Sequence, residues 1–377
     1  MAQKKYIILG TVVILYGIYI AWLDYDFEPI EFNFKKPPSF TGKLAPNNAL
    51  TGAEILLKGE VHAPEALVKE GNVIYTGTGD GKYLKIVDGK IEKVVGHGSG
   101  SCFGLRRLNK THFVGADMYV GLLLINYDLG TVEDLVPVGE DFNGLTIKNA
   151  NDFDIIDQNV IIFTESSHRW SVSQFGYMFV EHIFNGRVLK YDIAKNKLEL
   201  ILDGLYFPNG FLLHPDGESF LVGEFGASRI TRFYLSGPNK GKKEFFAENL
   251  PGYSDNIRLS SHGTIYVAMA AVRDPDQQSY MEKSASYPQV RKVLLQVVPE
   301  IFLKLWTLLQ IGVTRGLVLE YDYNGTLLRS LQDPTGGVNH FSHVEDDGTH
   351  LYLGSYINDF IAKVSIKKIE EELNVKF

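Results

Sequence analysis

The sequence predicts an all-β protein, a six-bladed β-propeller with an N-terminal transmembrane helix and a helical insertion in the fifth blade. The clearest evidence is the stretch 207–257, in which short apolar runs alternate with turn signals such as Pro215-Asp216-Gly217. Four brief strands joined by tight turns are typical of one antiparallel sheet. The opening of this unit recurs, because Asn209 and the pair Asp255-Asn256 each precede a turn glycine and a second strand. A sheet-sized unit that repeats indicates a propeller blade.

Six such units follow one another from about residue 51. Their second strands align at 73–78, 112–117, 160–166, 220–225, 265–270 and 351–356. Their third strands, which often end in Tyr, align at 83–87, 122–127, 187–191, 229–234, 317–321 and 361–364. The runs are short, β-rich and broken at close intervals by Gly, Asp and Asn, which disfavours helices. We therefore expect residues 51–377 to form the propeller. A strand near 54–58 should close it on the last blade, around 360–366, because an open ring leaves unpaired edges.

Composition narrows the range of functions. Of the 377 residues, 45% are hydrophobic and 12% aromatic, which suits a strand-rich protein with a sizeable core. The formal net charge is −8 and no long basic run occurs, so nucleic acid is not expected as a partner. Cys102 is the single cysteine, and an intrachain disulfide is therefore impossible.

The N-terminus carries a predicted membrane anchor. Residues 6–23 are 18 uncharged residues, long enough to span a bilayer. Two lysines precede them and four acidic residues follow by position 31. This asymmetry places residues 1–5 in the cytosol and the body in the lumen or outside the cell. A cleaved signal peptide is the alternative, but no A-x-A-like site follows the run. We expect an uncleaved signal-anchor and a single-pass type II protein of the endoplasmic reticulum or plasma membrane.

Two further segments have a predicted role. Residues 24–50 contain four prolines and little periodicity, which predicts a linker whose removal through Pro46 leaves the body stable. The sequons at Asn109 and Asn324 fall in expected hairpin turns and predict exposed glycosylation sites. Their position agrees with a luminal or extracellular body.

Residues 271–316 interrupt the fifth unit. Between 287 and 309 apolar residues recur at helical spacing, and Pro299 interrupts the run. One interpretation is a helix packed on the face of the propeller. The other is a lid over the channel mouth that presents Trp306, Leu305 and Phe302 to substrate or to the bilayer.

A candidate calcium site comes from the first strand of each unit, because first strands line the central channel of a propeller. The residues that open these strands are Glu65, Phe103, Asn151, Asn209, Asp255 with Asn256, and His343. Two carboxylates and three amides would converge on the axis, a set of hard oxygen ligands that suits Ca²⁺. Asn and Asp also commonly cap turns, and that remains the simpler explanation for any one of them alone.

A family resemblance rests on the segments FPNGFLLHPDG, FLVGEFGASRITRFYLSG, FAENLPGYSDNIR and HLYLGS. In these the chain resembles the strictosidine synthase-like, paraoxonase-related six-bladed propellers, and the resemblance extends from about residue 52 to 366. It implies a structural and catalytic calcium in the channel. The implied ligands are Glu65, Asn151, Asn209, Asp255 and Asn256.

The catalytic positions of that family fit less well. Phe103 stands where paraoxonase-type members carry a histidine. Strictosidine synthases use a glutamate in the first strand of the last blade, which here reads Phe341-Ser342-His343-Val344. With a one-residue gap in the alignment, His343 takes the place of the glutamate and becomes the candidate base. His168 is a second, weaker candidate.

Three functions follow from these residues. The first is a calcium-dependent hydrolase of small hydrophobic esters or lactones, resembling the arylesterases, in which Ca²⁺ polarises the carbonyl. The second is amine–aldehyde condensation, the strictosidine synthase reaction, against which the missing glutamate counts. The third is a non-catalytic binding platform, because fold alone does not establish chemistry. The membrane would be reached through the anchor and through the helix expected at 287–309.

Overall fold

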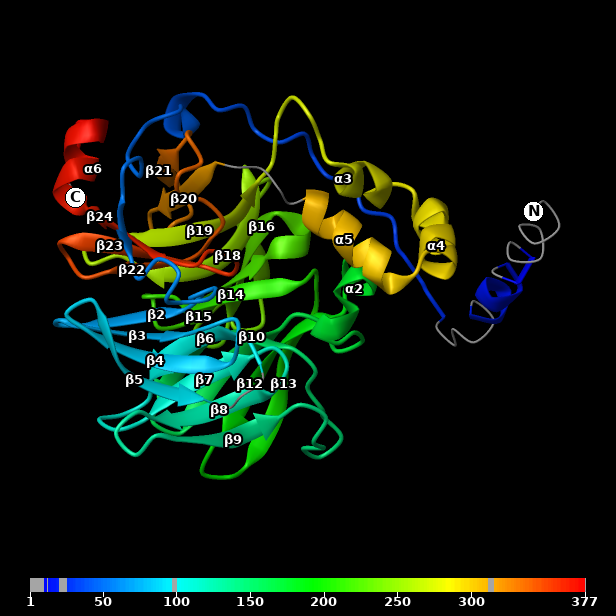
Figure 1. Cartoon of the computed structure of the whole chain (residues 1–377), viewed down its shortest axis with the longest axis horizontal. Coiled ribbons are helices and arrows are strands. Elements are labelled where there is room, and N and C mark those ends of the chain that lie inside the picture. Colours follow the sequence, from blue (N-terminus) through cyan, green and yellow to red (C-terminus); the bar gives the residue numbers. More distant parts are fainter. Residues whose placement is uncertain (1–9, 12, 20–25, 97–99, 311–314, 377) are drawn as a thin grey trace, which may run out of the picture.

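The computed structural model describes residues 10–11, 13–19, 26–96, 100–310 and 315–376. The described part of the body is six four-stranded antiparallel sheets arranged around a common axis, which confirms the predicted six-bladed propeller (Figure 1). Each sheet places its first strand innermost and orders the others outward along the chain, except at the ring closure. Apolar side chains fill the space between neighbouring blades, so each sheet is buried on both faces.

The strands agree closely with the predicted runs. Blades 1 to 3 contain β2 (Leu67–Glu70), β3 (Val73–Gly77), β4 (Lys82–Val87), β5 (Lys90–Gly96), β6 (Cys102–Arg107), β7 (Phe113–Asp117), β8 (Gly121–Asn126), β9 (Thr131–Pro137), β10 (Ala150–Asp157), β11 (Val160–Glu165), β12 (Gly186–Asp192) and β13 (Lys197–Leu205). Blades 4 to 6 contain β14 (Pro208–Leu213), β15 (Ser219–Glu224), β16 (Arg229–Tyr234), β17 (Lys243–Ala247), β18 (Gly252–Leu259), β19 (Ile265–Val272), β20 (Gly316–Tyr321), β21 (Leu327–Asp333), β22 (Phe341–Asp346), β23 (His350–Ser355) and β24 (Ile361–Ser365).

The ring is closed as predicted. β1 (Glu54–Leu56) pairs antiparallel with β24 and supplies the outermost strand of blade 6, so that both ends of the body meet in one sheet. α6 (Ile366–Leu373) follows directly and buries Ile366 and Ile369 against this blade. The pairing protects the edge of β24.

Most of the described helices gather on one face of the propeller: η2 (Val172–Gln174), α2 (Phe175–Glu181), η3 (Phe225–Ala227), α3 (Tyr280–Ala285), α4 (Pro288–Val297) and α5 (Glu300–Gln310). η1 (Gly42–Leu44) instead lies in the N-terminal segment beside β21, and α6 packs on blade 6. The helical insertion in blade 5 is therefore confirmed, and Pro299 separates α4 from α5. Pro288 occupies the first turn of α4, where its missing N–H removes no hydrogen bond.

Residues 26–50, called the strap below, are irregular but packed against the body. Phe27 is buried and its ring lies 5.1 Å from that of Tyr177. Farther along, Phe32 N donates to Ala285 O at 3.0 Å and Arg273 Nη2 donates to Lys35 O at 2.8 Å. These contacts predict a loss of stability when residues through Pro46 are deleted, in contrast to the expectation from the sequence.

The predicted anchor at 6–23 lies partly outside the described residues. Residues 10–11 and 13–19 are helical. Within the part of the chain that the structure describes, no helix is long and apolar enough to cross a membrane.

Candidate metal centre and cavity

The innermost strands bring the predicted ligands to the channel through β-bulges. In β10 the register shifts between Ala150 and Phe153, in β14 between Pro208 and Phe211, and in β18 between Ser254 and Ile257. Asn151, Asn209, Asp255 and Asn256 fall inside these three bulges. An extra residue in a strand bends it and redirects its side chains, which is why bulges are frequent beside functional sites.

Close approach of neighbouring inner strands explains the glycine after Asn209. A Cβ on Gly210 would lie 2.3 Å from Asp255 O and 2.7 Å from Asn256 Cα. A larger residue would therefore force β14 away from β18. The Asn209-Gly210 sequence thus keeps the ligands of blades 4 and 5 together.

All five predicted ligands are buried, and each keeps one oxygen without a hydrogen bond. Their exposed fractions are 4% or less. The oxygens that find no partner among the described residues are Glu65 Oε1, Asn151 Oδ1, Asn209 Oδ1, Asp255 Oδ1 and Asn256 Oδ1. A buried oxygen without a partner is costly, and the donors here are the carboxylate and amide oxygens that Ca²⁺ takes. The residues present therefore fit the calcium ion that the resemblance implies.

The two carboxyl groups are electrostatically strained in the absence of a cation. Burial raises the pKa of Glu65 well above its ordinary value, and the nearby Asp255 and Asp152 raise it further. Burial and Asp152 likewise raise the pKa of Asp255, although Arg258 opposes the shift. Two like charges in a confined space favour either a proton or a bound cation between them. In the described ranges, no group of three or more His, Cys, Asp or Glu side chains is arranged so that it could hold a metal ion, so any metal here depends on the amides as well.

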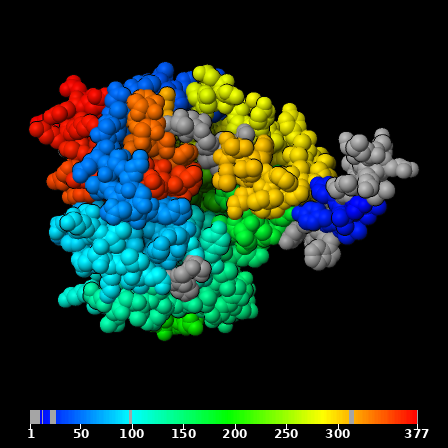
Figure 2. All heavy atoms as spheres, in the orientation of Figure 1, coloured from blue at the N-terminus to red at the C-terminus, as the bar shows by residue number. Residues whose placement is uncertain are grey.

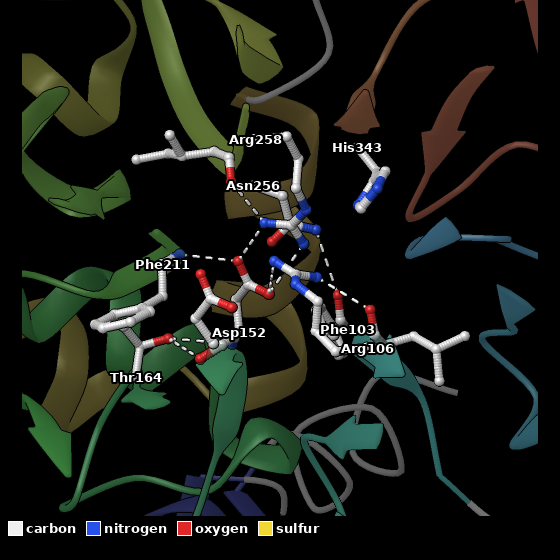
Figure 3. A network of polar contacts seen from close by, with 12 residues as sticks. Phe103, Arg106, Asp152, Thr164, Phe211, Asn256, Arg258 and His343 are labelled. Carbon is white, nitrogen blue, oxygen red and sulfur yellow. Dashed lines mark hydrogen bonds and ion pairs between the residues drawn. The ribbon is translucent and has the colours of Figure 1, made fainter. Parts of the chain in front are cut away.

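Below the ligands, buried ion pairs fill the channel and form a plug (Figure 3). Asp152 accepts from Arg258 Nη1 at 2.7 Å and from Arg258 Nη2 at 3.0 Å, and Arg106 Nη2 lies 3.6 Å from Asp152 Oδ1. Phe211 N also donates to Asp152 at 2.8 Å. Blades 2, 3, 4 and 5 are therefore tied together through Asp152. Sequence reasoning missed this plug, because neither arginine nor Asp152 has a local signature.

His343 belongs to the plug side of the channel, and it is not among the residues that line the cavity described below. Its Nε2 lies 3.4 Å from Glu345 Oε2. Burial, and then the charges of Arg258 and Arg106, lower the pKa of His343 well below the ordinary histidine value. The bulge of β22 falls between Phe341 and His343, so the position equivalent to Asn209 is Ser342, whose Oγ donates to Glu65 O at 3.0 Å. The structure thus does not bring His343 together with the ligands. The second candidate base, His168, is exposed and also lies outside the cavity lining.

A cavity of about 200 Å³ lies over the ligands on the helical face. Its polar floor includes Glu65, Asn151, Asn209 and Asp255. The remaining lining is mostly apolar and consists of Phe103, Met118, Tyr119, Val172, Phe175, Phe179, Phe207, Phe225, Ala270, Lys304, Leu308 and Tyr356. An apolar pocket with a few converging polar groups is the usual form of a small-molecule site.

Tyr356 places a hydroxyl on the wall of this cavity. Its Oη lies 3.2 Å from Nδ1 of His340 and 3.3 Å from Ala270 O. Burial raises the pKa of Tyr356, and the charges of Asp255 and Glu65 raise it further, so the hydroxyl keeps its proton at neutral pH. Sequence reasoning missed this group because it lies in a connection after β23, away from the first strands.

The helical insertion reaches the cavity, but only some of its side chains lie as the sequence predicted. Lys304 and Leu308 of α5 line the cavity, whereas Phe302 and Leu305 are 61% and 54% exposed on other sides of the helix. Trp306 packs partly buried against the clusters under α2. The insertion therefore contacts the cavity through Lys304 and Leu308 and not through the three predicted side chains, while the alternative, that those side chains face a bilayer, stays a prediction.

Comparison with known proteins identifies relatives along most of the chain. The strictosidine synthase family model matches residues 151–238, and the model for the N-terminal part of strictosidine synthase-like proteins matches residues 42–86. The adipocyte plasma membrane-associated protein of Gallus gallus is 35% identical over 362 residues, which cover 92% of this chain and 86% of that protein.

Two solved structures show the same architecture. A gluconolactonase from Xanthomonas campestris matches with a TM-score of 0.57 at 14% identity, over 91% of this chain and 99% of that one. Regucalcin from Agrobacterium tumefaciens, described as a calcium-binding protein, matches with a TM-score of 0.54 at 13% identity, over 83% and 93% of the two chains. At such identities the likeness establishes the propeller fold alone.

Proposed function

Because this chain belongs to the strictosidine synthase-like family that includes the adipocyte plasma membrane-associated proteins, we propose that it is a membrane-anchored, calcium-dependent hydrolase of hydrophobic esters or lactones. The observation that carries the proposal is the set of five buried oxygens without partners at the base of an apolar cavity. Two of the solved structures with a similar fold agree with the proposal by their names, since one is a gluconolactonase and the other a calcium-binding regucalcin.

The residues that would hold Ca²⁺ are Glu65, Asn151, Asn209, Asp255 and Asn256. When bound, the ion would act as a Lewis acid that polarises a carbonyl oxygen, and it would neutralise the carboxylates of Glu65 and Asp255. The chain itself contributes the position of these five side chains, which the bulges and the plug fix before substrate arrives. Preorganised groups of this kind lower a barrier because they need no rearrangement during the reaction.

Hydrolysis would form a bond between a water oxygen and the carbonyl carbon, break the bond to the leaving oxygen, and move one proton from the water to that leaving group. Tyr356 holds a proton at Oη on the cavity wall, where it can donate a hydrogen bond to the substrate. The phenylalanines of the lining exclude bulk water and favour an apolar acyl or alkyl group.

The amine–aldehyde condensation receives less support. Its glutamate would have to come from the first strand of blade 6, and no acidic residue of β22 is among the described residues that line the cavity. Glu345 accepts instead from Lys69 N at 2.9 Å, on the plug side. We further propose that the body is luminal or extracellular and tethered by a single type II anchor. The name of the relatives, plasma membrane-associated proteins, agrees with this placement.

Aryl-ester turnover by the purified full-length protein tests the function. We expect activity with Ca²⁺, none in excess EGTA, and none in Asn209→Ala, which loses a floor oxygen. The matched control is Asn239→Ala, because Asn239 is exposed in a turn far from the channel. Full activity in Asn209→Ala would exclude the calcium-centred mechanism.

Calcium itself is tested by thermal unfolding and elemental analysis. At free calcium about 100-fold above Kd, binding stabilises the folded state by about 2.7 kcal/mol. For a domain of this size that is a rise in Tm of roughly 4 °C. An unchanged melt in EGTA, together with no bound metal, would contradict a calcium site.

A further inference from the structure

The insertion in blade 5 presents an extensive apolar surface to solvent. Its exposed large side chains are Tyr280, Tyr287, Val290, Val293, Val297, Ile301, Phe302, Leu305, Leu308 and Leu309, with exposed fractions from 40% to 70%. Beside them, a groove of about 710 Å³ runs between α3, α4 and α5 and is lined by Tyr287, Leu294, Phe302 and Trp306, among others. A large apolar patch on a solvent-exposed face indicates a binding surface for protein or lipid.

The chain outside the described body indicates what covers this surface. The strap enters the body beside the insertion, because Phe27 packs on Tyr177 of α2 and Lys292 Nζ of α4 lies 4.0 Å from Asp26 Oδ1. The predicted membrane segment ends at residue 23, a few residues before this point. A chain of n residues spans at most about 3.3–3.6 Å per residue, so the bilayer that holds the segment would lie within roughly 10 Å of Asp26, the residue that contacts α4. The block of α3–α5 also projects from the body on the side where residues 13–19 lie (Figure 2).

The charges on the insertion suit a lipid surface. Lys283 and Lys292 lie among its apolar residues, and their long side chains can reach the headgroup level while the apolar residues enter the acyl region. α4 and α5 are both amphipathic, with Leu295 and Leu303 buried against α2 and the opposite sides exposed.

The two sequons lie on the opposite face of the propeller. Asn109 occupies the turn between β6 and β7, and Asn324 the turn between β20 and β21. Met118 and Tyr119, which line the cavity, follow β7 at its other end. Since antiparallel strands reverse at each turn, both sequons face away from the cavity. Glycans at these positions would be compatible with a helical face that lies against a membrane.

We infer that the face carrying α3–α5 docks on the bilayer into which the anchor inserts, so that the cavity takes its substrate from the lipid phase. Tyr119 and Leu308 line the cavity and are 49% and 45% exposed, which places its mouth on this face. The substrate class is therefore an ester or lactone with a long acyl or alkyl chain that partitions into membranes. This statement about substrate rests on the proposed hydrolase function, whereas the docked orientation rests on the proposed anchor alone.

Site-specific fluorescence in nanodiscs tests the orientation. The full-length protein is labelled with NBD at Ile301→Cys on α5 or, as the control, at Lys240→Cys in the β16–β17 turn of the opposite face. The native Cys102 is buried and should not react. In phosphatidylcholine nanodiscs containing doxyl-labelled lipid, we expect the label at 301 to lose most of its fluorescence and the label at 240 to keep it. Equal fluorescence of both labels, quenched or not, would overturn the docked orientation.

The substrate route is tested by Ile301→Glu combined with Leu305→Glu, neither of which lines the cavity. The double variant replaces two apolar side chains that the docked lipid would bury. We expect it to lower kcat/KM for a long-chain ester in the nanodisc by about tenfold or more. Turnover of a short soluble aryl ester should stay unchanged. An equal loss for both esters would overturn the route from the lipid phase. If the wild type hydrolyses neither ester, the proposed function and the route fail together, while the label experiment still decides the orientation.

Discussion

Arg291 of α4 is the residue whose replacement should most clearly uncouple the strap and the helical insertion from the propeller. The side chain is 2% exposed, and all of its donor nitrogens are occupied by backbone carbonyls. These carbonyls are Ser284 O at 3.1 Å, Val180 O at 3.1 Å, Glu181 O at 2.7 Å, Ala285 O at 3.0 Å and Ile30 O. One guanidinium therefore joins the strap, α2, α3 and α4.

The expected cost of Arg291→Met follows from these contacts. Burial lowers the pKa of Arg291 to about 10, so its removal relieves a desolvation penalty, but it leaves several buried carbonyls without their donor. Hydrogen bonds to a charged group contribute about 1.5–3 kcal/mol each, and breaking a buried charged network costs about 3–5 kcal/mol in all. After the relief of desolvation we expect a net loss of about 3 kcal/mol. Over roughly 330 residues, that lowers Tm by about 4 °C.

Differential scanning fluorimetry and limited proteolysis of the strap provide the measurement. Arg291→Lys keeps the charge but has three donors rather than five, so its melt should lie between those of the wild type and Arg291→Met. The matched control is Lys292→Met, the next residue on α4, whose side chain is 39% exposed and should contribute less than about 1 kcal/mol. A melt of Arg291→Met within a degree of the wild type, with a strap equally resistant to protease, would refute the role of this residue.

Two further predictions concern pH and ring closure. Burial, followed by the charges of Arg291 and Arg229, lowers the pKa of His182 to about 4 in the folded protein. As the pH falls, this histidine is therefore protonated in the unfolded chain before it is protonated in the folded protein. The free energy of unfolding is therefore fully retained above pH 6.5 and falls by up to about 3 kcal/mol towards pH 4. His182→Phe keeps a ring stacked on Tyr206 and should flatten the dependence of Tm on pH between these values. An unchanged slope would contradict the assignment. A chain that starts after Lys58 loses β1 and should aggregate on heating, whereas one that starts at Asp26 keeps β1 and the strap; equal light scattering from both would count against closure through β1.

The fold could be predicted because its signals are local. Each blade can be detected within about 45 residues from its short apolar runs and turn residues, and the pattern recurs in all six blades. The candidate ligands were found for a related reason, since equivalent positions in repeated blades face the same axis. Five side chains stand at those positions with buried oxygens that have no partner among the described residues, and their role as metal ligands stays a prediction.

The sequence was less informative where the structure departs from the regular repeat. A bulge adds one residue to a strand and so changes which residue faces the channel, and for this reason blade 6 places Ser342 where His343 was expected. The strap has no periodicity to detect, although its carbonyls satisfy Arg273 and Arg291. Irregular backbone is identified as structural only when its partners far away in sequence are known.

The charges of the plug complement those of the candidate metal centre. Glu65, Asp255 and Asp152 bring three carboxylates into the channel, and Arg258 with Arg106 brings two guanidiniums. Because Asp152 accepts from both Nη1 and Nη2 of Arg258, the arginines compensate its charge in the lower half of the channel and leave Glu65 and Asp255 facing the cavity. Two carboxylates with three amide oxygens then match a single divalent cation. Filling the channel below the candidate ligands also leaves the helical face as the side from which a substrate would reach them, so α5 and the proposed docking on a bilayer would together decide what the site can bind.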